Sequence, residues 1–177
     1  KQLLSRQTLH PGDVYVTNDP YCGGTHLPDI TVITPVYDPD SGELWFVTAS
    51  RAHHAEIGGI TPGSMPPFSK TLAEEGVLIR DFLLVARGTE RFAALGEHLA
   101  NAPYPSRNVA DNLADIAAQV AANQQGTQDL AALVERYGWP VVSAYMQHIQ
   151  AAAETKMRAA LAKLPDEVKR QGVTTKK

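Results

Sequence analysis

The sequence predicts an α+β protein with a β-hairpin-rich N-terminal half that carries the site and a three-helix C-terminal half. Its first half is rich in Val, Ile, Thr and aromatic residues, and the turn sequence Asp38-Pro39-Asp40-Ser41-Gly42 separates two apolar runs. Its second half repeats apolar residues at helical spacing. This change of pattern along the chain indicates the fold class.

Strands are predicted where short β-prone runs lie between turn residues. Three such runs cover residues 13–17, 30–37 and 44–50. The second and third flank the turn and are predicted to form a hairpin. Both are apolar on both sides, which favours a sheet covered on each face. The next segments are predicted to be an irregular ordered loop (60–68), a short helix (71–76) and an extended segment (77–85).

Three helices are predicted in the second half. An amphipathic helix over 107–123, which Gly126 ends, is indicated by Val109, Leu113, Ile116 and Val120. A short helix over 129–137 ends at Gly138, and Pro140 suits the first turn of a third helix that stops at Pro165. The stripe predicted to be apolar core on this third helix is Val142, Met146, Ile149, Ala153, Ala160 and Leu164.

These elements suggest a simple organisation. Residues 1–105 form a β-rich region with the metal site, residues 106–165 form a helical region, and residues 166–177 form a disordered tail. The chain begins at Lys1 and starts almost directly on a strand, so we expect a fragment of a larger domain. Such a fragment is expected to expose apolar surface and to form an oligomer.

Composition narrows the classes of partner. The net charge is −3 and no basic run occurs, which argues against nucleic acid and anionic membranes as partners. No apolar stretch approaches the about 20 residues needed to span a bilayer, and no signal-peptide h-region appears in the sequence. A single cysteine, Cys22, excludes an internal disulfide framework and suits a reducing, cytoplasmic location.

The chemistry concentrates in two segments, 18–29 and 50–59, at the two ends of the predicted hairpin. Together they hold three of the six histidines, three carboxylates and two Gly-Gly pairs. The hairpin returns the chain so that His53 or His54 comes near His26 and Asp29. Two imidazoles and one carboxylate with open positions for water are typical of a hydrolytic site for Zn²⁺, Mn²⁺ or Fe²⁺. Neighbouring strand residues point to opposite faces, so at most one of His53 and His54 is expected to bind the metal.

Several residues have two interpretations. Glu56 is a further ligand, a partner of a ligating histidine or a general base. Asp19 is either an Asx-turn residue or a polar group of the site. The Gly-Gly pairs also suit tight turns, and Cys22 is expected to be a passive thiol. For His10, His98 and His148, hydrogen-bonded roles outside the site are expected, and the glycine-rich run 58–64 lacks the Lys-Ser/Thr of a phosphate loop.

At these residues the chain resembles a known family. Asn18-Asp19-Pro20 with residues 23–29, and Ser50-Arg51-Ala52-His53-His54-Ala55 with residues 57–66, resemble the hydantoinase B family. That family includes N-methylhydantoinase B subunits, the C-terminal half of 5-oxoprolinase and the α subunits of acetone carboxylases. The run Gly-Gly-Ile-Thr-Pro-Gly-Ser-Met-Pro-Pro followed by Glu-Glu-Gly is similar to the 5-oxoprolinase and hydantoinase branch. The resemblance covers about residues 11–164.

The resemblance implies ATP-dependent opening of a cyclic amide, most simply 5-oxo-L-proline to L-glutamate. A hydantoinase A-like subunit or domain would bind ATP and Mg²⁺ and activate the amide, and the hydantoinase B part would hold a divalent metal that delivers water. By position, His26, Asp29 and His53 match the family's metal ligands. His54, Asp19 and Glu56 would line the site as catalytic residues, with Glu56 in place of the usual aspartate.

Two alternatives remain open from the sequence. One keeps the family and changes the substrate to a hydantoin, or the reaction to carboxylation. The other is a truncated, non-catalytic module with vestigial histidines that binds a larger subunit through its helices. Residues 167–177 do not resemble the family's continuation, so the isolated chain is expected to be inactive.

Overall fold

We describe residues 7–164 in a computed structural model. The chain divides into two compact units, with the division between Gln128 and Asp129. The first unit contains the whole sheet and both histidine-bearing segments. The predicted boundary at 105/106 follows the change in sequence pattern, whereas this division falls inside a helix. The predicted tail 166–177 lies outside the described residues.

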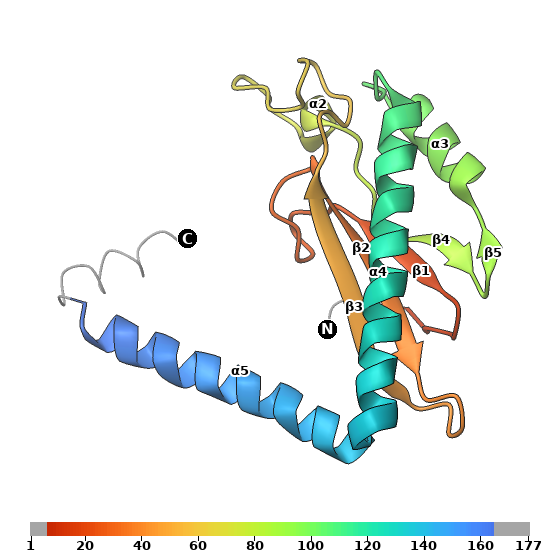
Figure 1. The fold of residues 1–177 in the computed structure, drawn as a ribbon. Helices are drawn as coiled ribbons and strands as arrows, with labels where there is room; N and C mark the ends of the chain where they lie inside the picture. The colour runs from red at the N-terminus through yellow and green to blue at the C-terminus, as the bar shows by residue number, and fades with distance from the viewer. Residues whose placement is uncertain (1–6, 165–177) are drawn as a thin grey trace. The chain divides into compact units, whose positions relative to one another are not determined.

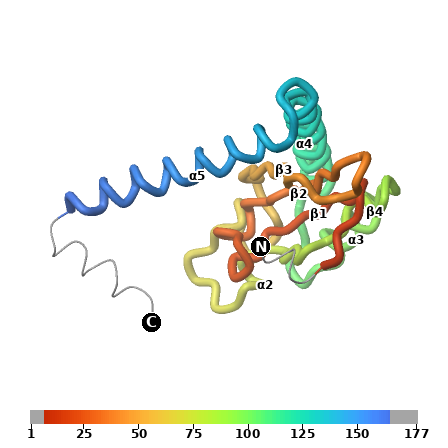
Figure 2. Tube along the Cα trace, turned by 90° about the horizontal axis from the view of Figure 1, so that it is seen from below, coloured from red at the N-terminus to blue at the C-terminus, as the bar shows by residue number. Residues whose placement is uncertain are grey.

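The first unit is built on a five-stranded antiparallel sheet. Its strand order is β3-β2-β1-β4-β5, so β1 lies between β2 and β4, as Figures 1 and 2 show. The predicted α+β class is thereby confirmed. The strands are β1 (Val14–Thr17), β2 (Asp29–Tyr37), β3 (Leu44–His53), β4 (Phe82–Ala86) and β5 (Thr89–Glu90).

The predicted hairpin is confirmed as β2 and β3. Asp38 closes its turn, because its N–H donates to the carbonyl of Glu43 over 2.8 Å and its carbonyl accepts from Gly42 over 2.9 Å. Gly42 has φ +73°, a left-handed conformation that favours glycine. The strands are longer than the apolar runs suggest: pairing extends from Tyr37↔Leu44 to Asp29↔His53. The hairpin therefore delivers an aspartate and a histidine to the same end of the sheet.

The helices differ from the prediction in one important way. The two helices predicted over 107–123 and 129–137 are one helix, α4 (Val109–Tyr137), and Gly126 does not interrupt it. A glycine inside a helix costs only about 1 kcal/mol, which the flanking helix formers and the packing of α4 on the sheet outweigh. The short helix near 71–76 is confirmed, and a helix after β5 was not predicted. The remaining helices are α2 (Leu72–Glu75), α3 (Phe92–Ala100) and α5 (Trp139–Ala162).

The core lies on one face of the sheet. Figure 1 draws the first part of α4 across the strands with α3 beside it. Both helices bury apolar side chains against the sheet, which corrects the prediction that the hairpin is covered on both faces: Val47, Ala49 and Arg51 on the other face of β3 are exposed. The fully buried residues of this core include Val16, Ile30, Val32, Ile79, Leu84, Leu95, Leu99 and Ile116.

Polar side chains also join α4 to the sheet. The amide nitrogen of Gln119 donates to the carbonyl of Ile30 over 3.1 Å, and that of Asn123 donates to the carbonyl of Val32 over 3.0 Å. Both amides are buried. Buried amides cost free energy unless they are hydrogen-bonded, so these pairs help to fix where along the hairpin α4 lies.

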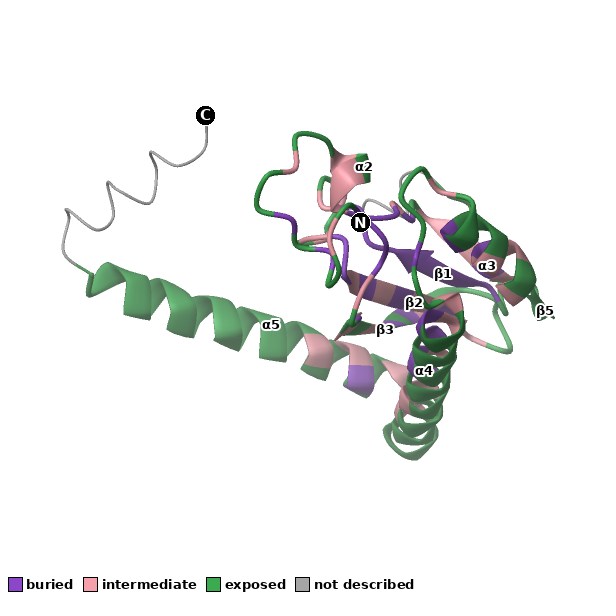
Figure 3. Ribbon diagram, turned by 90° about the horizontal axis from the view of Figure 1, so that it is seen from above, coloured by how far each residue is buried: buried purple, intermediate pink, exposed green. Residues whose placement is uncertain are grey.

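The second unit consists of the end of α4 and α5. Within α5, which is described in full, Val142 is the one buried residue, and Figure 3 shows α5 exposed along most of its length. The predicted core stripe is therefore wrong for this part: Ile149 is exposed, as is Met157. Among residues 7–164, no helix is long and apolar enough to cross a bilayer.

Candidate metal centre

Two of the three predicted ligands are held by strand pairing. Asp29 is the first residue of β2 and His53 the last of β3, and the register sets them directly opposite each other. Directly opposed residues project from the same face of a sheet, with their Cβ atoms about 5 Å apart. A one-residue slip would send both side chains to the opposite face, so the register of the hairpin determines the site.

The third ligand, His26, comes from the loop between β1 and β2. The buried Asn18 fixes the base of this loop: its side-chain nitrogen donates to the carbonyls of Leu27 and Val77, and its side-chain oxygen accepts from the N–H of Ile79 over 2.7 Å. Inside the loop, a Cβ on Gly24 would lie 2.6 Å from the carbonyl oxygen of Asp19. The motif needs this glycine because the backbone folds tightly on itself.

The loop and the hairpin bring the three predicted ligands together. Nδ1 of His26 lies 3.1 Å from Oδ2 of Asp29, and Nδ1 of His53 lies 3.0 Å from Oδ1. The two imidazole rings stack with centroids 5.1 Å apart. One ligand atom from each residue lies within 4.8 Å of the other two, and this is the one group of three or more His, Cys, Asp or Glu side chains with such spacing in residues 7–164.

The carboxylate of Asp29 is the centre of this group. Burial acts to raise its pKa, but the hydrogen bonds from Thr25 and His53 and the proximity of His26 outweigh burial and lower the pKa below its ordinary value. The Thr25 hydroxyl donates to Oδ2 of Asp29. Asp29 is therefore held as an anion that faces two imidazoles, which is the charge state a metal ligand requires. Thr25 was missed at the sequence level, although it lies four residues before Asp29.

Arg51 is a second residue that the sequence reasoning missed. It pairs with Thr31 across the hairpin, one step along the same sheet face from the Asp29↔His53 pair. Its Nε donates to the Thr31 hydroxyl over 2.8 Å, and its Nη2 donates to the carbonyl of Gly23 over 2.8 Å. Arg51 thus ties the loop that carries His26 to the strand that carries His53. Its position two residues before His53, directly after the predicted strand 44–50, could have identified it if that strand had been extended to His53.

His54 does not join the group. It is 1% exposed, and its Nδ1 and Nε2 lie 2.7 Å and 3.2 Å from the side-chain oxygens of Asn112 and Gln119 on α4. Both amide nitrogens donate elsewhere, to Glu56 and to the carbonyl of Ile30, which orients the amide oxygens toward the imidazole. These contacts fasten α4 to the end of β3, so the role of His54 as a catalytic residue that lines the metal site stays a prediction that they do not support.

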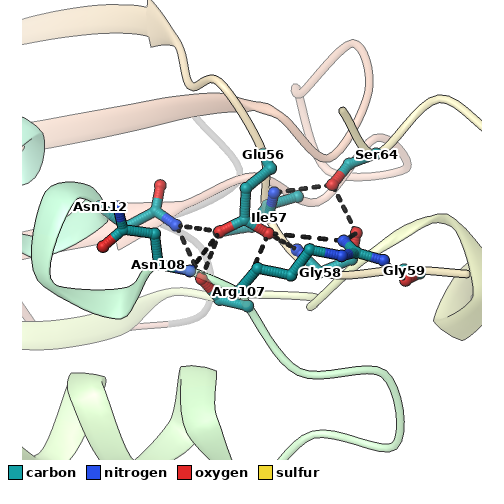
Figure 4. A network of polar contacts seen from close by, with 9 residues as sticks. Glu56, Ile57, Gly58, Gly59, Ser64, Arg107, Asn108 and Asn112 are labelled. Atoms are coloured by element: carbon teal, nitrogen blue, oxygen red, sulfur yellow. Dashed lines mark hydrogen bonds and ion pairs between the residues drawn. The ribbon is translucent and has the colours of Figure 1, made fainter. Parts of the chain in front are cut away.

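Glu56 is the centre of a separate polar network (Figure 4). Its carboxylate accepts from the backbone N–H groups of Gly58 (2.7 Å), Arg107 (3.1 Å) and Asn108 (3.2 Å), and from the side chains of Ser106 and Asn112. Burial acts to raise the pKa of Glu56, but these hydrogen bonds, led by that of Ser106, lower it. These donors use the capacity of both oxygens, so the geometry does not support a ligand or general base here.

Both carboxylate oxygens of Asp19 have partners in the protein. Its Oδ1 accepts from the N–H of Tyr21, which confirms the Asx-turn interpretation, and its Oδ2 lies 2.7 Å from Nε of Arg80. Burial acts to raise the pKa of Asp19, but the hydrogen bonds from Tyr21 and Arg80 lower it. Asp19 is fully buried and outside the group of three, so its role as a catalytic residue stays a prediction that these contacts do not support.

The remaining glycines and histidines lie outside the group of three. Gly23, Gly58 and Gly59 have φ values of +98°, +81° and +86°, which favour glycine. A Cβ on Gly58 would also collide with the carbonyl oxygen of Tyr104, and one on Gly59 would lie 2.8 Å from that of Glu74. His10 contacts Arg87, His98 contacts the carbonyl of Leu78, and His148 lies edge-on to Tyr145.

The residues present fit a divalent metal. Two imidazoles and an ionised carboxylate converge on one point, and the side chains of His26 and His53 keep 34% and 53% of their surface exposed. A set of three protein ligands open to solvent is typical of catalytic rather than structural sites, since a structural site is closed by a fourth ligand.

A comparison with protein families assigns the chain. The model described as "Hydantoinase B/oxoprolinase" matches residues 1–176. The chain belongs to this family. It is 47% identical over 171 residues to 5-oxoprolinase 1 from Arabidopsis thaliana, covering 92% of this chain and 13% of that protein. It is 50% identical over 147 residues to 5-oxoprolinase from Dictyostelium discoideum, covering 83% of this chain and 11% of that protein.

The fold of this family member also matches a solved structure. An ATP-dependent caprolactamase from Pseudomonas jessenii aligns with a TM-score of 0.75 and 32% identity over 90% of this chain and 26% of the caprolactamase chain. The present chain therefore spans about an eighth of the 5-oxoprolinases and about a quarter of the caprolactamase chain that it matches. The hydantoinase B resemblance inferred from the motifs is confirmed.

Proposed function

We propose that this chain is the metal-binding segment of an ATP-dependent hydrolase that opens a cyclic amide, with 5-oxo-L-proline converted to L-glutamate. The observation that carries the proposal is the convergence of His26, Asp29 and His53 within 4.8 Å in a member of the family that contains the 5-oxoprolinases. An ATP-dependent caprolactamase of the same fold supports lactam opening as the reaction class. Hydantoin hydrolysis is the alternative within that class.

The roles of the residues follow from their chemistry. His26 and His53 offer imidazole nitrogens and Asp29 a carboxylate, a set that suits Zn²⁺, Mn²⁺ or Fe²⁺. A bound divalent ion supplies Lewis acidity and lowers the pKa of its water towards 7. Thr25 orients Asp29 by donating to Oδ2, and Arg51 holds the loop of His26 against the hairpin. Glu56 and His54 lie outside the ligand set. They act through their contacts with Asn112, which hold α4 against the end of β3.

ATP and Mg²⁺ are assigned to a hydantoinase A-like subunit or domain rather than to this chain. Opening an unstrained lactam is unfavourable, and coupling to ATP overcomes this. The partner would activate the amide carbonyl by phosphorylation, and the segment described here would provide water at the activated carbon.

Metal analysis by mass spectrometry tests the first half of the proposal. The chain is loaded with Zn²⁺ or Mn²⁺, freed of excess ion and compared with His26→Ala, Asp29→Asn and His53→Ala. We expect one ion per wild-type chain and an affinity lower by at least about tenfold in each variant. His148→Ala is the matched control, because the His148 ring lies edge-on to Tyr145 on α5 and is not part of the group of three. Absence of metal from the wild-type chain would instead favour a vestigial, non-catalytic module.

Turnover measurements test the proposed reaction, and they need the complete enzyme. The same three substitutions in an assembly that hydrolyses 5-oxo-L-proline are expected to abolish activity. Retained turnover in any one of them removes that residue from the site, and faster turnover of hydantoins than of 5-oxo-L-proline moves the substrate assignment to the alternative.

A further inference from the structure

The sheet face that carries the metal centre also carries one unpaired cation. Arg51 and His53 are two residues apart on β3, so their Cα atoms are roughly 7 Å apart on the same face. The Arg51↔Thr31 pair is the next pair on the same face of the hairpin, with the Ala52↔Ile30 pair between it and the His53↔Asp29 pair. The arginine side chain also contacts Gly23, in the loop that carries His26, so Arg51 lies beside the group of three candidate ligands.

The guanidinium of Arg51 is fixed along only one edge. Nε donates to Thr31 and Nη2 to the carbonyl of Gly23, both over 2.8 Å. The edge formed by Nη1 and the second hydrogen of Nη2 has no protein partner within residues 7–164, and the side chain is exposed. An arginine whose stem is already ordered loses less conformational freedom when it binds a ligand.

Arg51 differs from three other arginines of the described chain in that no carboxylate neutralises its charge. Arg80, Arg107 and Arg158 each form an ion pair with an aspartate or glutamate. Arg51 has no ion pair in the described region, since its two partners are a hydroxyl and a carbonyl. It is thus a positive charge available to an anionic group beside the metal centre.

We propose that Arg51 binds the carboxylate of the substrate through its free Nη1/Nη2 edge, so that the site selects lactams that carry a carboxylate over neutral lactams. This inference rests on the proposed function, because the metal centre defines where the substrate lies. Two parallel N–H groups match the two oxygens of a carboxylate. 5-Oxo-L-proline carries such a group, whereas unsubstituted hydantoin and caprolactam do not.

Ligand binding to the metal-loaded chain tests the inference without turnover. The Mn²⁺-loaded chain is titrated with 5-oxo-L-proline and with its neutral carboxamide, and binding is followed by the relaxation that Mn²⁺ causes in ligand protons. We expect the acid to bind at least about tenfold more tightly than the amide, as a charge-assisted bidentate pair predicts. Arg51→Gln should remove this preference, and Arg51→Lys should retain part of it.

The controls separate recognition from structure. Arg91→Gln is the matched variant, because Arg91 follows β5 at the opposite edge of the sheet and should bind both ligands as the wild type does. The Mn²⁺ affinity of each variant is measured in parallel. A structural role alone predicts that Arg51→Gln weakens Mn²⁺, acid and amide binding together and leaves the acid-to-amide ratio unchanged.

Four results would overturn the inference. The first is a ratio unchanged in Arg51→Gln, which means that the metal or another group binds the carboxylate. The second is the pattern of a purely structural role, in which Arg51→Gln weakens Mn²⁺, acid and amide binding together. The third comes from a parallel titration with inorganic phosphate. If Arg51→Gln loses phosphate binding but keeps the acid-to-amide ratio, the arginine binds a phosphoryl group instead of the carboxylate. The fourth is no preference, or no binding of the acid, in a wild-type chain that holds Mn²⁺. A wild-type chain that holds no Mn²⁺ contradicts the proposed function itself.

Discussion

At the scale of single residues, the site depends on backbone positions as much as on ligands. Gly24 lets the loop fold so that its N–H reaches the carbonyl of Asp19 over 2.9 Å, and Thr25 and His26 follow directly. Asn18 satisfies three backbone groups at the base of the same loop. Gly24 and Asn18 thus help to place the imidazole of His26 beside Asp29 through the backbone of the loop.

Gly24→Ala is therefore expected to damage the site. The added Cβ would lie 2.6 Å from a backbone oxygen, so the loop must move, and we expect a loss of about 2–3 kcal/mol in the free energy of unfolding. Metal affinity should fall by about tenfold. Denaturant titration and metal binding measure the two effects.

Gly42→Ala is the matched control for this change. Its Cβ would meet nothing within 4 Å, so only the left-handed φ of +73° opposes it. We expect about 1 kcal/mol of destabilisation and no change in metal affinity. Equal metal affinities of the Gly24→Ala and Gly42→Ala chains would show that the loop does not position His26.

At the scale of elements, α4 and the hairpin are fixed to each other by a polar seam. The seam consists of Glu56 at the N-terminus of α4, His54 with Asn112 and Gln119, and Asn123 further along. Each group is buried or half-buried, and each has hydrogen-bond partners. Because apolar contacts are not directional, such polar contacts fix the register of a helix on a sheet more sharply than the core does.

Glu56→Gln should weaken this seam in a pH-dependent way. The variant replaces one acceptor oxygen of the side chain with an amide nitrogen that donates, although the neighbouring groups are themselves donors. We expect the free energy of unfolding to fall by about 1–3 kcal/mol at neutral pH. The folded pKa of Glu56 is lowered from 4.5, so the unfolded carboxyl takes up its proton first as the pH falls. The stabilisation is therefore full above pH 4.5 and is lost as the pH falls through the lowered folded value.

Denaturant titrations between neutral and acid pH measure this effect. The difference in stability between wild type and Glu56→Gln should shrink as the pH falls below the ordinary glutamate range. Glu97→Gln, at an exposed position on α3, serves as the control with a small and constant difference. A pH-independent cost in Glu56→Gln would mean that the charge of Glu56 contributes nothing.

Gly126→Ala should stabilise the chain, in contrast to Gly24→Ala. Gly126 lies inside α4, and the added Cβ would meet only Cγ2 of Thr48, at an ordinary contact distance of 3.8 Å. Alanine is the better helix former by about 1 kcal/mol. We expect a higher thermal midpoint with unchanged metal affinity. A lower midpoint would indicate that the helix needs flexibility at this position.

At the scale of the whole molecule, the metal centre and the core belong to the first unit. The buried core residues lie between Val14 and Ile116, before the division at Gln128. Up to residue 164, where the description ends, the second unit buries only Val142 and exposes large side chains, among them Tyr145, Ile149 and Met157. Stability and metal binding should therefore depend on the first unit.

Removal of the residues after Tyr137 tests this division. The shortened chain keeps all of α4, so the seam and the core stay complete. We expect its metal affinity to change by less than about twofold, because the three candidate ligands all lie in the first unit. Circular dichroism verifies the fold, and metal analysis measures the site. Loss of metal from a folded, shortened chain would show that the second unit supports the centre.

The sequence alone was sufficient for the family, the fold class, the hairpin and the segments that bring candidate ligands together. Strand alternation and turn chemistry are local properties, and they predict that His26, Asp29 and only one of His53 and His54 meet. The tertiary structure decided the rest. It chose His53, because the register pairs it with Asp29, and it gave His54 and Glu56 to the contacts with α4. Local glycine propensity predicted a break in α4, whereas packing against the sheet kept the helix continuous. These outcomes depend on partners far apart in sequence, such as Glu56 with Asn108, which no local pattern contains.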